Sequence, residues 1–216
     1  GSASKEPAPN VIVSVDNSAS MGTSGMTALK NALKATFDPS FIEDGRIRMA
    51  YQSMWTCSEN SAIPHFNPNY DTSLNSSTAD KYNTSCNGFV PMAPLSGSIS
   101  DKTSHRGKFF TWIDTLVHKN GTPTHAMMRN AGEYLKVTGD NSAWNAIPGI
   151  ADSKPIACRR AYHILMTDGG WNYFNDMPMF DGNFKNAQAE IHDQMLDNAD
   201  GTAKTLPDGV VYDPTS

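Results

Sequence analysis

The feature that most constrains this chain is a short apolar run that breaks directly into a polar turn. Val11–Val15 is β-branched apart from Ser14, which is typical of a buried strand in a parallel sheet. The next residues, 16–20, read Asp-Asn-Ser-Ala-Ser and put one carboxylate and two hydroxyls at alternate positions. Oxygen ligands so grouped suit a hard cation such as Mg²⁺. Ligands of open α/β sheets also bind at the carboxyl ends of the strands, so the run predicts a metal-binding turn.

The following segments predict a β-α-β opening. Apolar residues recur at spacings of three and four from Met26 to Phe37, which predicts a one-faced helix ending near Asp38-Pro39. Alternation over residues 46–55 predicts the second strand.

Later segments continue this alternation of helices and strands. Helical spacing over 107–119 predicts a helix closed by Asn120-Gly121, and a second helix follows from 124 to about 136. We expect a loop over 137–157, followed over 161–167 by another strand, which like residues 11–15 is apolar and expected to be buried. A short helix is expected near 187–195, and 206–216 reads as irregular.

One stretch interrupts the pattern. Residues 56–104 are rich in Asn, Ser, Thr and Pro without lasting periodicity, and so long a segment predicts a functional insertion. Residues 1–9 read as a flexible lead-in that begins with a cloning remnant. The expected organisation is a single domain over 10–216 that carries the insertion.

Composition excludes several partner classes. The net charge is −5, which gives no basic footprint for nucleic acid. No apolar run approaches the roughly 18 residues of a membrane span. Abundant Asn, Ser and Thr fit a secreted or surface protein, in which a Cys57–Cys86 disulfide would close the insertion. Pairing of Cys158 with either of these cysteines, or three reduced thiols, are the alternatives.

Oxygen-bearing residues follow three separate segments at comparable places. Asp16, Ser18 and Ser20 leave the first strand, Thr122 opens a helix, and Asp168 leaves the second apolar strand. If the two strands are neighbours, the three loops converge over one crevice. Singly, each residue fits a helix cap or a turn better than a ligand role, but their conjunction favours a shared cation site.

The order D-x-S-x-S, G-T-P and T-D-G resembles the metal-ion-dependent adhesion site of von Willebrand factor A domains. The resemblance implies a Rossmann-like α/β fold with a mostly parallel central sheet flanked by helices. It also implies bound Mg²⁺, with Mn²⁺ or Ca²⁺ as alternatives. The ligands carried over are Asp16, Ser18, Ser20, Thr122 and Asp168, whereas Thr124 is less suited as a ligand and would instead act as a cap or a buttress. Two departures are Ala19 and Asn120, where the family usually has Gly. Few apolar runs follow Asp168, so we expect an A domain that is incomplete at its C-terminus.

Within that family the sequence is similar to those of the type IV pilus tip adhesins of the PilC/PilY group. The stretch from Cys158 through Thr167-Asp168-Gly169-Gly170 to Trp171-Asn172 carries most of the likeness. The resemblance implies an exported protein at the pilus tip that takes part in surface attachment and pilus biogenesis. Its implied partners are minor pilins and a host receptor that supplies an Asp or Glu carboxylate to the cation.

Two other functions compete with adhesion. The first is a metal-assisted hydrolase or phosphoryl-transfer enzyme, which needs a base near the ion. His125 and His163 are the histidines placed near the expected site, but a capping role and a core role suit them better, and the sequence has no Walker-type phosphate loop. We therefore expect a protein that is not an enzyme. The second competitor is a structural pilus subunit with an empty site.

Overall fold

The sheet and its helices are built from the residues that the computed structural model describes: 6–55, 89–119, 121–122, 124–169, 204–205 and 211–212. The elements of the main sheet and its helices are β1 (Asn10–Val15), α1 (Gly22–Thr36), β2 (Arg48–Ser53), β3 (Val90–Pro94), α2 (His105–Thr115), α3 (Thr124–Leu135) and β4 (Ala161–Met166). Single 3₁₀ turns occupy Ala19–Met21 and Gly139–Asn141. Two short strands, β5 (Lys204–Thr205) and β6 (Val211–Tyr212), pair antiparallel with each other.

The strand order is β3-β2-β1-β4. β1 pairs parallel with β2 on one side and with β4 on the other, whereas β3 runs antiparallel to β2. The chain therefore reverses its direction of travel across the sheet between β1 and β4, and this reversal creates the crevice in which doubly wound sheets bind ligands. The predicted α/β class with a mostly parallel sheet is confirmed for the described residues.

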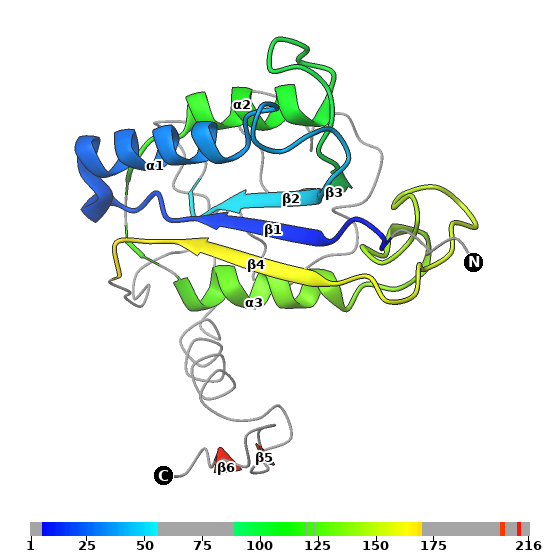
Figure 1. Cartoon of the computed structure of the whole chain (residues 1–216). Helices are drawn as coiled ribbons and strands as arrows, with labels where there is room; N and C mark the ends of the chain where they lie inside the picture. Colours follow the sequence, from blue (N-terminus) through cyan, green and yellow to red (C-terminus); the bar gives the residue numbers. More distant parts are fainter. Residues whose placement is uncertain are drawn as a thin grey trace.

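Helices cover both faces of this sheet. α1 and α2 lie on one face and α3 lies on the other (Figure 1). Alternate residues of β1 explain the two cores, because successive side chains of a strand point to opposite faces. Val11, Val13 and Val15 pack with the first pair of helices, while Ile12 packs with Ala131 and Tyr134 of α3.

The predicted opening is confirmed. All six residues of β1 are buried, and α1 buries Met26, Leu29 and Leu33 along the predicted face. The α1 helix ends at Thr36, with Phe37 as its C-cap. β2 lies inside the predicted range of 46–55.

The predicted range of the insertion, 56–104, extends too far towards the C-terminus. Residues 90–94 form β3 at the edge of the sheet, next to β2. Pro91 and Pro94 hid this strand from a search for periodicity, since proline is tolerated in strands mainly at sheet edges. Residues 56–88, with Cys57 and Cys86, lie outside the described part of the chain.

The helix predicted over 107–119 begins and ends earlier. Ser104 caps α2 by accepting a hydrogen bond from the Gly107 amide (3.0 Å), so the helix starts at His105. It stops at Thr115 because Leu116 is already extended. Residues 116–119 instead approach the turn that follows β1. The second helix has the predicted range, and it buries Met127, Ala131 and Tyr134.

The prediction of a buried strand over 161–167 is right about the strand and wrong about its burial. β4 spans Ala161–Met166, but Tyr162 is 50% and Ile164 39% exposed. The physical reason is position: among the described strands β4 has a neighbour only on the β1 side.

Other expectations meet the structure only in part. The loop over 137–157 is confirmed apart from the single 3₁₀ turn within it. Residues 206–216, expected to be irregular, contribute the two-residue strand β6. Cys158 has an exposed free thiol. The helix expected near 187–195 lies outside the described residues, as do Asn120 and Gly170. No helix in the described ranges is long and apolar enough to cross a membrane.

Candidate metal site at the carboxyl edge of the sheet

Asp16 is the first residue beyond β1, and its side chain is fully buried. One carboxylate oxygen, Oδ1, accepts a hydrogen bond from the Ser18 amide at 2.8 Å. The other, Oδ2, accepts from the Thr167 hydroxyl at 2.8 Å. The Asp16 amide donates to the Met166 carbonyl at 2.8 Å, so β1 and β4 remain paired up to the site.

The two serines of the turn lie against each other. Ser18 Oγ and Ser20 Oγ are 3.0 Å apart, and Ser18 is fully buried. The 3₁₀ turn over 19–21 brings them together before α1 begins at Gly22. Two hydroxyl oxygens thus lie on the same turn as the buried carboxylate of Asp16, in the arrangement that the D-x-S-x-S spacing predicts.

Asn17 joins this turn to the other loops of the same edge. Its side-chain oxygen accepts from the Trp55 amide (2.8 Å), and its side-chain nitrogen donates to the carbonyls of Trp55 and Val117 (3.0 Å each). Its own carbonyl accepts from the Lys119 amide at 2.9 Å. Trp55 extends the connection by donating its indole N–H to the Gly121 carbonyl at 2.8 Å. One buried amide therefore holds the segment before Thr122 beside the Asp16 turn.

The two threonines of the G-T-P-T stretch are both buried. Thr122 lies in the loop next to Gly121 and is 5% exposed. Thr124 begins α3, and its amide donates to the Thr122 carbonyl at 2.9 Å. Its hydroxyl is buried and has no hydrogen-bond partner among the described residues. An oxygen left in this state is costly unless something outside the described contacts satisfies it.

Asp168 reaches the same edge from β4 but is exposed. It follows Thr167, whose hydroxyl contacts the Asp16 carboxylate and accepts from the Gly169 amide at 3.1 Å. Gly169 has a φ of +99°, a conformation that favours glycine and turns the loop after Asp168. The structure therefore brings the ends of β1 and β4 together, and it leaves the second aspartate open to solvent.

These residues fit a divalent cation on the chemistry of their donor atoms. A fully buried carboxylate is strongly disfavoured unless it is paired or coordinated. Asp16 forms no ion pair within the described ranges; the ion pairs found there are Lys34–Asp114, Arg106–Asp44 and Arg160–Glu6. Hydroxyl and carboxylate oxygens are what Mg²⁺ prefers. No group of three or more His, Cys, Asp or Glu side chains that could hold a metal ion is found among the described residues.

Three residues of this edge were not among the predicted site residues: Asn17, Trp55 and Thr167. Asn17 sits inside the D-x-S motif, so its position pointed to the site, but its partners lie 38 and 100 residues away. Thr167 precedes the predicted Asp168 and reaches across to the neighbouring strand. Sequence spacing carries no information on such long-range hydrogen bonds.

A polar chain crosses the α3 face of the sheet near the site. Gln52 Nε2 donates to Ser14 Oγ (2.8 Å) and to the Met127 carbonyl (2.9 Å), and Ser14 Oγ lies 2.7 Å from His163 Nε2. Since Ser14 already accepts from Gln52, its hydroxyl can donate to a neutral His163. Burial lowers the pKa of His163, which favours this neutral form. The arrangement ties β4 to β1 and β2.

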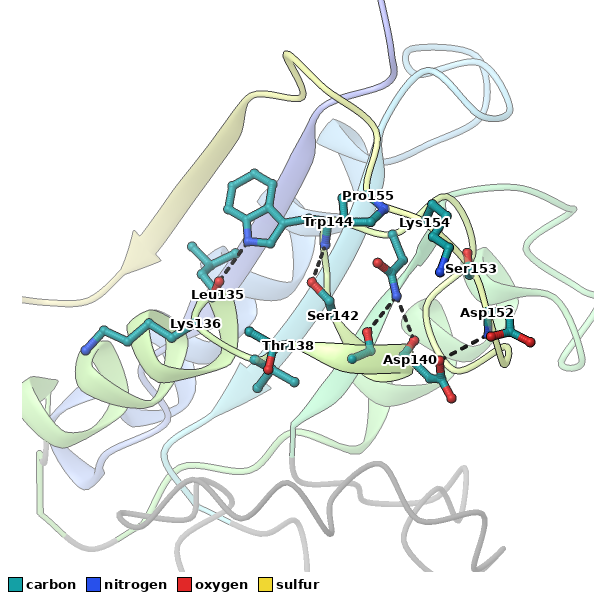
Figure 2. Close-up of a pocket in the computed structure, with 13 residues that line it drawn as sticks. Leu135, Lys136, Thr138, Asp140, Ser142, Trp144, Asp152, Ser153, Lys154 and Pro155 are labelled. Atoms are coloured by element: carbon teal, nitrogen blue, oxygen red, sulfur yellow. Dashed lines mark hydrogen bonds between the residues drawn. The ribbon is translucent and has the colours of Figure 1, made fainter.

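The opposite, amino edge of the sheet carries a separate cavity of about 480 Å³. Figure 2 shows the loop after α3 folding around it, with the Trp144 indole donating to the Leu135 carbonyl (2.8 Å). The Asp152 amide donates to Asp140 Oδ1 at 3.1 Å (Figure 2). The Asn145 side chain donates to the Asp140 carbonyl at 3.0 Å. These polar groups form hydrogen bonds with one another, so we interpret the cavity as a structural feature of the loop and not as a binding site.

The strand order and the polar edge together define a doubly wound α/β domain with a candidate cation site at its switch point. The chain is 41% identical over 108 residues to the type IV pilus biogenesis factor PilY1 of Pseudomonas aeruginosa strains PAO1 and PAK. It is 36% identical over 109 residues to the protein of that name from strain UCBPP-PA14.

These matches cover about half of this chain and under a tenth of the relatives. The shares are 50% and 8% for the first two proteins, and 48% and 9% for the third. No protein-family profile matches the chain, and no solved structure matches it. A relation to PilY1 is therefore shown over part of the chain, while the A-domain assignment and its metal ligands stay predictions.

Proposed function

We propose that this chain is a divalent-cation-dependent binding module of a type IV pilus-associated surface protein, with a von Willebrand factor A-type architecture. The observation that carries the proposal is the fully buried Asp16 carboxylate, which accepts hydrogen bonds from the Ser18 amide and the Thr167 hydroxyl and has no charged partner among the described residues. The relation to PilY1 supports the pilus setting, an exported location and partners among pilus components.

The chemistry of the donor set favours binding. Asp16, Ser18, Ser20, Thr122 and Asp168 would hold the ion, of which only the two aspartates are charged. A divalent cation held mostly by neutral oxygens keeps part of its positive charge and open coordination positions. It would attract a carboxylate from a partner protein, so that the ion bridges the two surfaces. The resident ion that we propose is Mg²⁺, with Mn²⁺ or Ca²⁺ as alternatives.

The geometry gives little support to catalysis. Ser14 and His163 form a serine–histidine contact of 2.7 Å that resembles a nucleophile with its base. Ser14 is fully buried inside β1, however, where no substrate can reach its hydroxyl. We therefore propose adhesion rather than hydrolysis or phosphoryl transfer for this edge.

Calorimetric titration of Mg²⁺ and Mn²⁺ tests the proposal. We expect binding by the metal-stripped chain and none by Asp16→Ala, because that substitution removes the buried carboxylate. Asp114→Ala is the matched control, since Asp114 is an exposed carboxylate paired with Lys34. Retained affinity in Asp16→Ala, or no binding by the parent chain, would contradict the proposal. Thermal unfolding of each variant shows whether the fold is kept.

A further inference from the structure

A groove adjoins the candidate metal site on the α1 side. It has a volume of about 440 Å³ and lies between the first half of α1 and the segment that follows α2. Its described lining consists of Thr23, Met26, Thr27 and Lys30 from α1, and of residues 116–119. This volume falls within the range of small-ligand pockets and suits one large side chain with its flanking backbone.

The groove is held next to the metal-site turn by direct contacts. Asn17, between Asp16 and Ser18, donates its side-chain N–H to the Val117 carbonyl at 3.0 Å. It also accepts from the Lys119 amide at 2.9 Å. One wall of the groove is therefore hydrogen-bonded to the turn that carries the candidate ligands. The other wall starts with Thr23 in the first turn of α1, directly after the same turn.

The floor of the groove is apolar. Met26 is 4% and Leu116 1% exposed, and Val117 is half-buried beside them. Met26 and Leu116 belong to the larger hydrophobic core, so this part of the floor is held by the core. An aliphatic side chain placed here would lose apolar surface to water at about 25 cal/mol per Å².

The charged residues of the groove are basic, although the chain as a whole has a net charge of −5. Among the described lining residues, Lys30 and Lys119 carry charge at neutral pH, and no aspartate or glutamate is present. Lys30 lines the groove, and its Nζ donates to the carbonyl of Asp114, two residues before the lining residue Leu116, at 3.2 Å. Burial lowers the pKa of Lys30, and the carboxylate of Asp114 opposes that effect. A ligand carboxylate here would face a cation that is partly withdrawn from water.

We propose that this groove is the specificity pocket of the cation site, and that it takes an acidic peptide segment of a partner protein with an aliphatic side chain. One carboxylate of the segment would approach the ion, the aliphatic side chain would enter the groove over Met26 and Leu116, and a second carboxylate would lie near Lys30. The part that concerns the ion rests on the proposed function, whereas the groove is a feature of the described structure.

The test uses the full chain, labelled with ¹⁵N and titrated in Mg²⁺ with three capped tripeptides. The probe is acetyl-Asp-Leu-Glu-amide, and its controls replace the leucine by alanine or the glutamate by glutamine. We expect amide shifts at residues 26–30 and 116–119, and about tenfold weaker binding when leucine becomes alanine. Equal affinity of the leucine and alanine peptides, or shifts confined to other surfaces, would overturn the proposal.

Two variants, each with a matched control, assign the contacts. Thr27→Trp fills the groove and should abolish the preference for leucine, whereas Thr36→Trp places the same side chain at the exposed end of α1. Lys30→Gln should abolish the preference for glutamate over glutamine, and Lys102→Gln, beyond the other end of α2, should not. Dispersed amide spectra confirm that each variant folds. A preference that survives both groove variants would contradict the assignment.

Failure of the groove and failure of the metal site give different results. If the chain does not bind Mg²⁺, the proposed function fails. The same titration in EDTA still tests the groove, because binding of the peptide there would give amide shifts at 26–30 that depend on the leucine. If Mg²⁺ binds and the three peptides bind alike, the cation site stands and the groove proposal fails. Absence of leucine-dependent shifts under both conditions overturns the groove in either case.

Discussion

β1 and β4 run parallel, side by side, over the same number of residues, and yet they meet different surroundings. β1 is buried along its whole length, whereas β4 exposes half of Tyr162 and over a third of Ile164. Both strands lead into an aspartate, and the same contrast continues there. Asp16 is fully buried and hydrogen-bonded at both oxygens, while Asp168 is exposed.

The difference teaches that burial here follows from sheet position more than from composition. β1 has a strand on each side and helices on both faces, whereas β4 has one described neighbour. The same contrast gives the two aspartates different tasks in the proposed site. The buried one would fix the ion, and the exposed one would complete the ligand set where a partner can approach.

The largest expected effect is on the stability of the two strands. Ile12 of β1 is fully buried, so Ile12→Ala should lower the free energy of unfolding by about 2–5 kcal/mol. Ile164→Ala removes the same atoms from β4 and should cost less than about 1 kcal/mol, since the side chain is 39% exposed. Denaturant unfolding of both variants measures the difference. Equal losses of unfolding free energy would show that Ile164 is as well buried in solution as Ile12, which contradicts the exposure of β4.

The second prediction compares two histidines at different depths. Burial lowers the pKa of His105 to about 4, although its hydrogen bond to the Met49 carbonyl (2.7 Å) acts in the opposite direction. The unfolded chain then takes up this proton first as the pH falls. Stability contributed by neutral His105 is complete above about pH 6.5 and is lost towards pH 4, with a total of up to about 3 kcal/mol.

The measurement is the free energy of unfolding at pH 7.5 and pH 4.5 for the parent, His105→Gln and His163→Gln. Removing His105 should reduce the acid-induced loss strongly. Removing His163 should reduce it less, because burial also lowers the pKa of this residue but its side chain is more exposed. A larger effect of His163→Gln than of His105→Gln would contradict the conclusion that His105 is the more deeply buried histidine.

The smallest expected effect lies at the contact between the two strand ends. Thr167→Val removes the hydroxyl that donates to Asp16 Oδ2 and should cost about 1 kcal/mol of unfolding free energy. Under the proposed function it should also weaken Mg²⁺ binding about tenfold or more, because groups that orient a ligand tune the affinity for the metal. Thr167→Ser keeps the hydroxyl and should behave as the parent in both assays. Unchanged stability and Mg²⁺ affinity in Thr167→Val would show that the contact is unimportant.

Local patterns predicted much of the framework. The β-branched run of β1, the spacing of Met26, Leu29 and Leu33 in α1, and the alternation of β2 each follow from a periodicity of a few residues. They missed β3, whose two prolines break the pattern, and they extended α2 past Thr115. Both errors arise where a tertiary neighbour decides the backbone: β2 pairs with the proline-containing edge strand, and Asn17 holds the segment after α2.

The sequence by itself determined which chemistry is available at the candidate site. Asp16, Ser18, Ser20, Thr122 and Asp168 supply oxygen donors at the ends of predictable elements, because strand and helix termini can be read from local composition. The tertiary structure alone decided which of them are buried, that the Thr167 hydroxyl contacts Asp16, and that a groove with basic residues lies beside the turn. Those properties depend on contacts between residues up to 151 positions apart, and no local pattern encodes such contacts.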